Sequence, residues 1–190
     1  MHHEVRLRRL ATNELTDREL EHLHALLIEA FIDAFDEPSE PEEAFSKDDW
    51  YHALGGVHVL AEVDGRVVAH ASVVDRVLQV DGRPLRTGYV EAVATVREAR
   101  GRGYGTAVME VIDEIIREGY ELGALGTGAY HFYERLGWRA WPGPTAVRTE
   151  TGEQRTPNAD RYVFFLRTPA TPPLDEKATL SCDWRPGDVW

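Results

Sequence analysis

The segment that most constrains this chain is a glycine-rich loop, Arg100-Gly101-Arg102-Gly103-Tyr104-Gly105-Thr106, between a predicted strand and a predicted helix. The strand covers residues 85–96, and the helix runs from about residue 105 to 118 with its apolar residues on one face. Glycines let backbone N–H groups approach an anion closely, and a helix N-terminus adds the positive end of its dipole. The pattern predicts a pyrophosphate site, with a glycine-rich turn that binds nothing as the alternative.

Two common pyrophosphate-binding patterns fit this loop poorly. A dinucleotide fingerprint needs a third glycine, but counting from Gly101 that position is Thr106. The Lys-Ser/Thr pair of a P-loop is absent from the segment. The spacing Arg100-x-x-Gly103-x-Gly105 instead resembles the acyl-CoA signature of the GNAT acetyltransferases. A Rossmann-type nucleotide binder stays open as an alternative, which protection by NAD but not by CoA would support.

The order of predicted elements indicates one mixed α/β (α+β) domain covering residues 1–190. A capping-box pattern at Thr16 and Glu19 begins a helix that extends to about Phe35. A helical turn at 50–54, two hairpins and a strand–helix–strand unit follow. The predicted strands are 57–63, 67–80, 85–96, 121–125, 161–166 and 178–184, with a short helix at 130–136. The GNAT resemblance implies a single-domain fold with a mostly antiparallel central sheet, splayed at the acyl-CoA site and flanked by helices.

Charge and cysteine content limit the classes of partner. With 21 Lys and Arg against 33 Asp and Glu, the formal net charge is -12. Phosphate contacts need clustered basic residues, so we expect no nucleic-acid partner and favour a cationic small molecule, unless the acidity serves solubility alone. Cys182 is the only cysteine, which fits a reducing, cytoplasmic setting. No apolar run is long enough to cross a membrane, and no membrane partner is expected.

The GNAT resemblance implies acetyl-CoA as cosubstrate. In that family the free backbone groups of a strand pair with the pantetheine arm, here Val93, Ala94 and Thr95, and the loop holds the pyrophosphate. The predicted acyl-CoA-binding residues are therefore Val93, Ala94, Thr95, Arg100, Gly101, Arg102, Gly103, Tyr104, Gly105 and Thr106. The segment Phe132-Tyr133-Glu134-Arg135-Leu136-Gly137-Trp138 resembles a later family motif, in which a tyrosine lies near the CoA sulfur.

Further segments resemble the aminoglycoside 2'-N-acetyltransferases. The most specific is Cys182-Asp183-Trp184-Arg185-Pro186-Gly187-Asp188-Val189-Trp190, and Gly88-Tyr89-Val90-Glu91-Ala92-Val93, Asp49-Trp50 and Leu122-Gly123-Ala124-Leu125 also match. The resemblance implies direct acetyl transfer to an amine of a cationic amino-sugar antibiotic, at the 2' position of an aminoglycoside. In these enzymes the terminal carboxylate, here that of Trp190, faces the antibiotic.

Acetyl transfer needs a neutral amine, so a group must take the amine's proton near working pH. Glu91 is the candidate base, with a structural ion pair as its alternative role. Tyr133 is the candidate acid for the departing thiolate, with ordinary helix packing as its alternative role. A polycationic acceptor needs several carboxylates. The candidate catalytic residues are Glu91, Tyr133 and Trp190, and the candidate acceptor-binding residues are Asp33, Asp36, Asp49, Glu91, Ala92, Asp160, Asp188 and Trp190.

One segment leaves the identity of the acceptor amine open. Thr156-Pro157-Asn158-Ala159-Asp160 keeps one acid where the resembled enzymes have an acidic pair. Another amine, such as that of kasugamycin, a polyamine or a peptide, is therefore an alternative acceptor, and a CoA-binding module without turnover is an alternative of another kind.

The histidines are scattered, so no metal site is expected. Dimers are common among GNAT proteins, and a homodimer stays open here.

Overall fold

A computed structural model describes residues 4–32 and 44–190 of the chain. The chain divides into two compact units. Unit 1 comprises Met1–Val74 and Val90–Ile112, and unit 2 comprises Asp75–Tyr89 and Asp113–Trp190. Strands β3 (Arg66–Val80) and β4 (Arg83–Thr95) and helix α4 (Tyr104–Gly119) contribute residues to both units. Across the part of the chain that the structure describes, no helix is long and apolar enough to cross a membrane.

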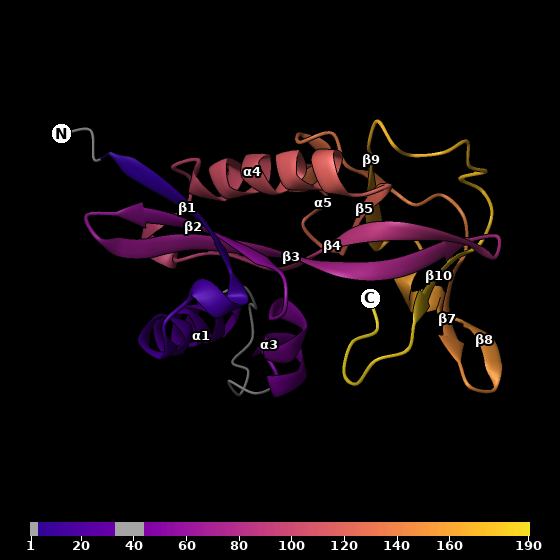
Figure 1. The fold of residues 1–190 in the computed structure, drawn as a ribbon, viewed down its shortest axis with the longest axis horizontal. Helices are drawn as coiled ribbons and strands as arrows, with labels where there is room; N and C mark the ends of the chain where they lie inside the picture. The colour runs from indigo at the N-terminus through magenta and orange to yellow at the C-terminus, as the bar shows by residue number, and fades with distance from the viewer. Residues whose placement is uncertain (1–3, 33–43) are drawn as a thin grey trace. The chain divides into compact units, whose positions relative to one another are not determined.

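Unit 1 is built on antiparallel strands. β1 (Val5–Ala11) pairs with β2 (Val57–Val63), which pairs with β3. The helices α1 (Asp17–Ile32) and α3 (Lys47–Ala53) lie on one side of these strands, and α4 begins on the other (Figure 1). Short 3-10 turns at Thr12–Glu14 and Arg97–Ala99 complete the unit.

Local sequence chemistry explains where these elements begin and end. Helix α1 opens with the predicted capping box, because the Glu19 backbone N–H donates to the Thr16 hydroxyl and the Thr16 N–H donates to the Glu19 carboxylate. The predicted turn between β2 and β3 is confirmed by left-handed φ angles of 50° at Asp64 and 76° at Gly65. Helix α3 begins at Lys47, earlier than predicted, because Ser46 caps it.

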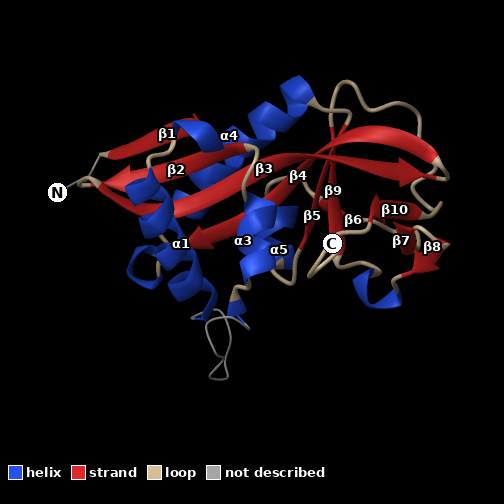
Figure 2. Ribbon diagram, turned by 60° about the horizontal axis from the view of Figure 1, so that its bottom comes forward, coloured by secondary structure: helices blue, strands red, loops and turns tan. Residues whose placement is uncertain are grey.

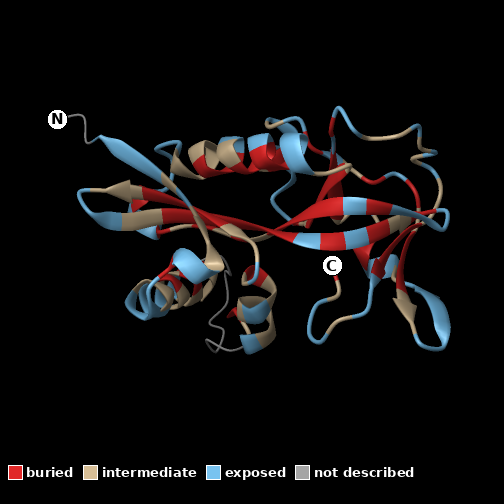
Figure 3. Cartoon of the chain, in the orientation of Figure 1, coloured by how far each residue is buried: buried red, intermediate tan, exposed pale blue. Residues whose placement is uncertain are grey.

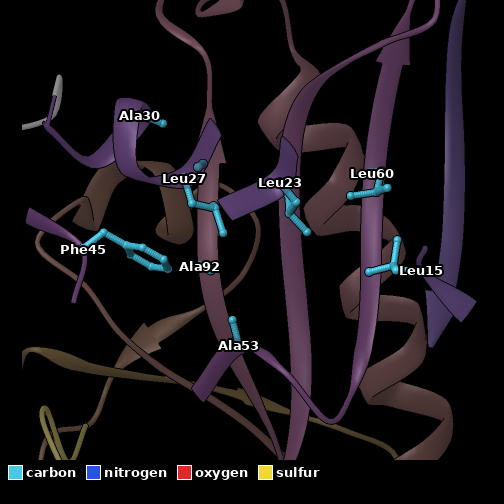
Figure 4. Packing of buried hydrophobic residues seen from close by; sticks show 9 residues of the cluster. Leu15, Leu23, Leu27, Ala30, Phe45, Ala53, Leu60 and Ala92 are labelled. Atoms are coloured by element: carbon cyan, nitrogen blue, oxygen red, sulfur yellow. The ribbon is translucent and has the colours of Figure 1, made fainter. Parts of the chain in front are cut away.

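The apolar core of unit 1 lies under α1 and α3. A cluster of buried side chains from both helices, from the segments just before them and from β2 and β4 fills it (Figure 4): Leu15, Leu23, Leu27, Ala30, Phe45, Ala53, Leu60, Ala92 and Ala94. The middle of β2 is buried, whereas the first part of β1 is exposed (Figure 3). The core thus holds the last residues of β4, including Ala92, against the helices.

Unit 2 contains the remaining strands. β5 (Leu122–Gly126) pairs with β9 (Val163–Arg167), which also pairs with the short β6 (Arg139–Ala140). β10 (Leu180–Asp183) pairs with β3 and, in parallel, with β7 (Thr145–Thr149), which forms a hairpin with β8 (Gly152–Arg155) (Figure 2). The helix α5 (Tyr130–Glu134) and a 3-10 turn at Pro157–Ala159 lie in its connections.

Close packing in unit 2 depends on small residues and on one buried carboxylate. A Cβ on Gly123 would stand 3.0 Å from both Ile116 and Trp138, so β5 packs tightly against the end of α4 and the Trp138 ring. The Trp138 indole N–H donates to the buried Asp113 carboxylate over 3.0 Å. This hydrogen bond satisfies the indole N–H, so the large Trp138 ring is buried without an unpaired donor.

The fold class predicted from sequence is confirmed. Antiparallel pairing dominates, and the parallel ladder between β4 and β5 joins Thr87–Tyr89 to Leu122–Ala124, while β4 continues to Thr95. Sequence reasoning missed β1, β6, β7 and β8. A single domain over residues 1–190 stays a prediction.

Candidate active site

The last part of β4 carries Glu91 and the residues predicted to pair with pantetheine. Glu91, Val93 and Thr95 are half-buried, whereas Ala92 and Ala94 are buried in the core of unit 1. Ala92 has a φ of 51°, a left-handed value that is uncommon for a residue with a Cβ. The strand is therefore irregular at the position next to the candidate base.

The predicted pyrophosphate loop has the geometry that such a group needs. Gly101 and Gly103 adopt left-handed φ angles of 75° and 85°, and the space where a Cβ would stand is open at both positions. Gly101, Arg102 and Gly103 are exposed, and the 16-residue helix α4 begins at Tyr104. These residues fit the pyrophosphate of acetyl-CoA, because three exposed residues lead directly into the N-terminus of a long helix.

Arg100 has a structural role within this loop. Its Nε donates to the Thr95 carbonyl over 3.1 Å, and its Nη2 donates to the Ala30 carbonyl of α1 over 3.1 Å. The side chain thus ties the loop to the end of β4 and to α1. Arg102 is also exposed, and it is the second of the two charges predicted to face phosphate.

We expect Gly101→Ala to raise the KM for acetyl-CoA about tenfold, because a left-handed alanine costs on the order of 1–2 kcal/mol of strain in the loop. Initial rates at varied acetyl-CoA measure this change. Gly119→Ala is the matched control. Gly119, at the end of α4, also has open space where a Cβ would stand, but its φ is not left-handed. An equal KM in the two variants would remove Gly101 from the acyl-CoA site.

Tyr133 lies buried on α5 in unit 2. Its ring contacts Phe132 and Trp138 edge to face, with centroids 4.9 and 6.4 Å away. Burial raises the pKa of Tyr133 far above its ordinary value, and the charges of Tyr162 and Asp113 raise it further. The phenol therefore keeps its proton at every working pH, as an acid must before it donates.

The C-terminal segment is anchored in unit 2 through several polar contacts. The Trp190 indole N–H donates to the Thr156 hydroxyl over 2.9 Å, and the Trp190 backbone N–H donates to the Asp188 carboxylate over 3.1 Å. The buried Arg76 donates to the Val189 carbonyl over 2.9 Å. Asp188 and Trp190, both predicted at the acceptor, are thus direct neighbours.

Two further candidate carboxylates already have structural partners. Asp49 completes the capping box of α3, in which its carboxylate accepts from the backbone N–H of the cap residue Ser46 over 2.8 Å. Asp160 accepts from the Thr145 N–H and from Arg155, both over 2.8 Å. Desolvation is the largest influence on the pKa of Asp160 and raises it, but the bonds from Thr145 and the charge of Arg155 together lower it. Asp33 and Asp36 lie outside the described residues.

Sequence reasoning missed a polar cluster in unit 1. His58 on β2 and His70 on β3 are fully buried and face each other, with His58 Nδ1 3.0 Å from His70 Nε2. A register shift between Ala61 and Glu62 brings them together: Val63 pairs with Arg66 at the turn, but His58 pairs with Ser72 beyond the shift. Without this shift the turn would place the two histidines on opposite faces of the sheet.

These histidines make stability depend on pH. Burial lowers the pKa of His58 to about 4 and that of His70 to about 3, and their described hydrogen-bond partners are neutral groups. Below pH 6.5 the unfolded chain takes up protons that the folded protein does not, so stability present above that pH is lost as pH falls toward 3. We expect the free energy of unfolding to decrease by roughly 2–5 kcal/mol between pH 7 and pH 4.5.

Urea unfolding at the two pH values measures this loss. A double variant, His58→Leu with His70→Leu, supplies the comparison, because it lacks both titrating rings. Its free energy of unfolding should vary less with pH than that of the parent protein. The same pH dependence in both proteins would show that other groups cause it.

Comparison with known proteins decides the family. A model described as "Acetyltransferase (GNAT) domain" matches residues 11–141, which include β4, the glycine-rich loop, α4 and Tyr133. The chain belongs to the GNAT acetyltransferases. This GNAT acetyltransferase transfers an acetyl group to an amine, and acetyl-CoA is the acetyl donor.

A relative of this GNAT acetyltransferase is the aminoglycoside 2'-N-acetyltransferase of Mycolicibacterium fortuitum. The two sequences are 42% identical over 183 residues, a match that covers 94% of this chain and 89% of that protein. The E. coli GNAT family N-acetyltransferase YhbS, solved in complex with CoA, has the same fold, with a TM-score of 0.65, 16% identity and coverage of 96% of this chain and 91% of YhbS.

Longer solved proteins also contain this fold. A probable N-acyltransferase from Enterococcus faecalis matches with a TM-score of 0.56 and 18% identity over 73% of this GNAT acetyltransferase. The chain spans about a third of that protein's length, since 33% of it is covered.

Proposed function

We propose that this acetyltransferase transfers the acetyl group of acetyl-CoA to the 2'-amine of an aminoglycoside. The observation that carries the proposal is its 42% identity to a named aminoglycoside 2'-N-acetyltransferase over 94% of the chain. The net charge of -12 supports a polycationic acceptor, which it would attract at low salt.

Acetyl-CoA supplies an activated acetyl thioester, and the chain's own residues hold it and move protons. The loop Arg100–Gly103 and the N-terminus of α4 hold the pyrophosphate, and the backbone of Val93, Ala94 and Thr95 holds the pantetheine arm. The Glu91 carboxylate takes the proton of the amine, directly or through water. The Tyr133 hydroxyl donates a proton to the CoA sulfur as the thiol leaves. The backbone N–H of Val93 polarises the thioester carbonyl.

On the acceptor side we propose Asp188, Trp190, Ala92 and Glu91, together with Asp49 and Asp160. Asp188 is exposed, so its carboxylate is accessible to an ammonium group. Asp49 and Asp160 also serve the fold, and each would contact an acceptor through an oxygen lone pair that its structural bonds leave over. Asp33 and Asp36 stay predictions.

Paired acceptors test the proposal. Tobramycin carries a 2'-amine, whereas kanamycin A carries a 2'-hydroxyl, and CoA thiol release from acetyl-CoA is followed with each. Release with tobramycin alone is the expected result. Release with both would place the modified amine elsewhere, and no release with either, in protein that binds acetyl-CoA, would overturn the aminoglycoside assignment.

A second acceptor class has one observation in its favour. The segment Thr156–Asp160 has Asn158 between its two ends and keeps one acid, and that carboxylate is bonded to Thr145 and Arg155. A smaller amine, such as a polyamine or kasugamycin, would need fewer carboxylates. Spermidine and kasugamycin therefore belong beside tobramycin in the same assay, and a higher kcat/KM with either would favour this class.

A further inference from the structure

The buried histidines of unit 1 form a hydrogen-bonded chain to the strand that carries Glu91. The Thr12 hydroxyl lies 2.8 Å from His58 Nε2, His58 Nδ1 lies 3.0 Å from His70 Nε2, and His70 Nδ1 lies 2.7 Å from the Ala92 carbonyl oxygen. Both rings are fully buried. No step of the proposed reaction uses these side chains.

The carbonyl at the end of this chain fixes the position of every proton. The Ala92 oxygen can only accept, so His70 Nδ1 carries a hydrogen and the neutral ring accepts at Nε2. His58 must then donate from Nδ1 and accept at Nε2. The Thr12 hydroxyl hydrogen therefore goes to His58 Nε2, 2.8 Å away, rather than to its more distant acceptor, the Gly56 carbonyl at 3.3 Å. The Gly55 backbone N–H donates to that hydroxyl over 2.9 Å. All donors therefore point toward Ala92, and such head-to-tail bonds strengthen one another.

The segment that receives this chain departs from regular strand geometry. Ala92 is left-handed at a φ of 51°, a conformation that costs about 1–2 kcal/mol for a residue with a Cβ. Side chains of β3 hold two successive carbonyls here: His70 donates to Ala92, and the Ser72 hydroxyl donates to the Glu91 carbonyl over 3.2 Å. These bonds fix the two peptide groups on either side of the Ala92 Cα. The first peptide group carries the Glu91 carbonyl and the second contains the Val93 N–H, so the positions of Glu91 and of the Val93 N–H are fixed as well.

We propose that His58 and His70 are positioning residues for acetyl transfer, which hold the Ala92 carbonyl so that Glu91 and the Val93 N–H keep the geometry of the reaction. The assignment rests on the proposed function of Glu91 and Val93. His70 acts on the strand directly, and His58 acts by fixing the tautomer of His70.

Two other roles for the pair conflict with its contacts. A proton relay to the reaction is excluded because the chain ends on a carbonyl oxygen, which passes no proton onward. A metal site would need ring nitrogens as ligands, but all four ring nitrogens already have hydrogen-bond partners. The contacts instead support holding the backbone, because His70 Nδ1 lies 2.7 Å from the Ala92 carbonyl oxygen.

Substitutions at His70 separate positioning from general stability. In His70→Asn the amide nitrogen can occupy the place of Nδ1 and donate to the Ala92 carbonyl, whereas His70→Leu removes the donor. We expect His70→Leu to lower kcat with tobramycin at least tenfold and His70→Asn to stay within about threefold of the parent enzyme, at a temperature where all variants are folded. His58→Leu should fall between them.

Val59→Ala is the matched control. Val59 is fully buried on β2 next to His58, and its side chain points to the opposite face of the sheet. This variant loses stability without touching Ala92, so its kcat should equal that of the parent enzyme. Equal kcat values in His70→Leu and His70→Asn, or a loss of kcat in Val59→Ala as large as that in His70→Leu, would overturn the positioning role.

A second readout tests the hydrogen-bonded chain itself. Nitrogen-15 NMR of the parent enzyme at pH 7 should show both rings neutral with the hydrogen on Nδ1, and a hydrogen on Nε2 of either ring would overturn the chain. Parent enzyme that releases no thiol with any aminoglycoside would overturn the proposed function and this role with it. Active parent enzyme with an unchanged His70→Leu variant would overturn this role alone.

Discussion

Glu91→Gln is expected to lower kcat by roughly 100- to 10,000-fold, the range of contributions measured for a positioned general base. The amide keeps the size of the carboxylate but cannot accept the proton of the amine. Acetyl-CoA binding should change little, because the loop that holds the pyrophosphate is untouched. Steady-state rates and calorimetric titration with acetyl-CoA measure the two effects separately.

The matched control for this variant is Glu110→Gln. Glu110 is an exposed carboxylate on α4 in the same unit, so the change in charge is the same. Its kcat should equal that of the parent enzyme. If Glu91→Gln weakened acetyl-CoA binding as much as it lowered kcat, Glu91 would hold the strand rather than take the proton.

Tyr133→Phe is the second change with a large expected effect, a decrease in kcat of about 100-fold. The variant keeps the aromatic contacts with Phe132 and Trp138 but lacks the hydroxyl that donates to the leaving thiolate. Burial raises the pKa of Tyr133 far above 10, so the parent enzyme should show no loss of rate from its ionisation below pH 10. Rates of thiol release across pH 6–10 check both statements.

Tyr130→Phe supplies the control on the same helix. Tyr130 is exposed, and its ring stacks on Phe164 with centroids 5.5 Å apart. Removing this hydroxyl should leave kcat unchanged. Equal rates for the two phenylalanine variants would assign Tyr133 to packing alone.

Local patterns in the sequence predicted much of this fold. The Thr16–Glu19 capping box, the Asp64-Gly65 and Asp81-Gly82 turns and the glycine-rich loop all have short-range causes, and the structure has each of them. The strand β1 was missed because most of its residues are exposed and three are arginines, so no buried face shows in its sequence. In the short β7–β8 hairpin every residue of β8 is likewise exposed.

The sequence predicted the parts of the candidate site that depend on residues adjacent in the chain. It did not predict the parts that depend on contacts between distant residues or on the register of paired strands. The loop glycines stand together in the chain, so their left-handed geometry follows from their identity. The bond of Arg100 to Ala30 joins residues 70 apart. The contact between His58 and His70 depends on a one-residue shift in the register of β2 against β3. No short-range pattern specifies such contacts.

The position of the acetyl group on the product shows which amine of the aminoglycoside the enzyme modifies. Tobramycin is incubated with the enzyme and acetyl-CoA, and two-dimensional NMR of the purified product locates the new amide. We expect a single acetyl group on the 2'-nitrogen. An acetyl group on any other amine, or tobramycin recovered unchanged, would contradict it.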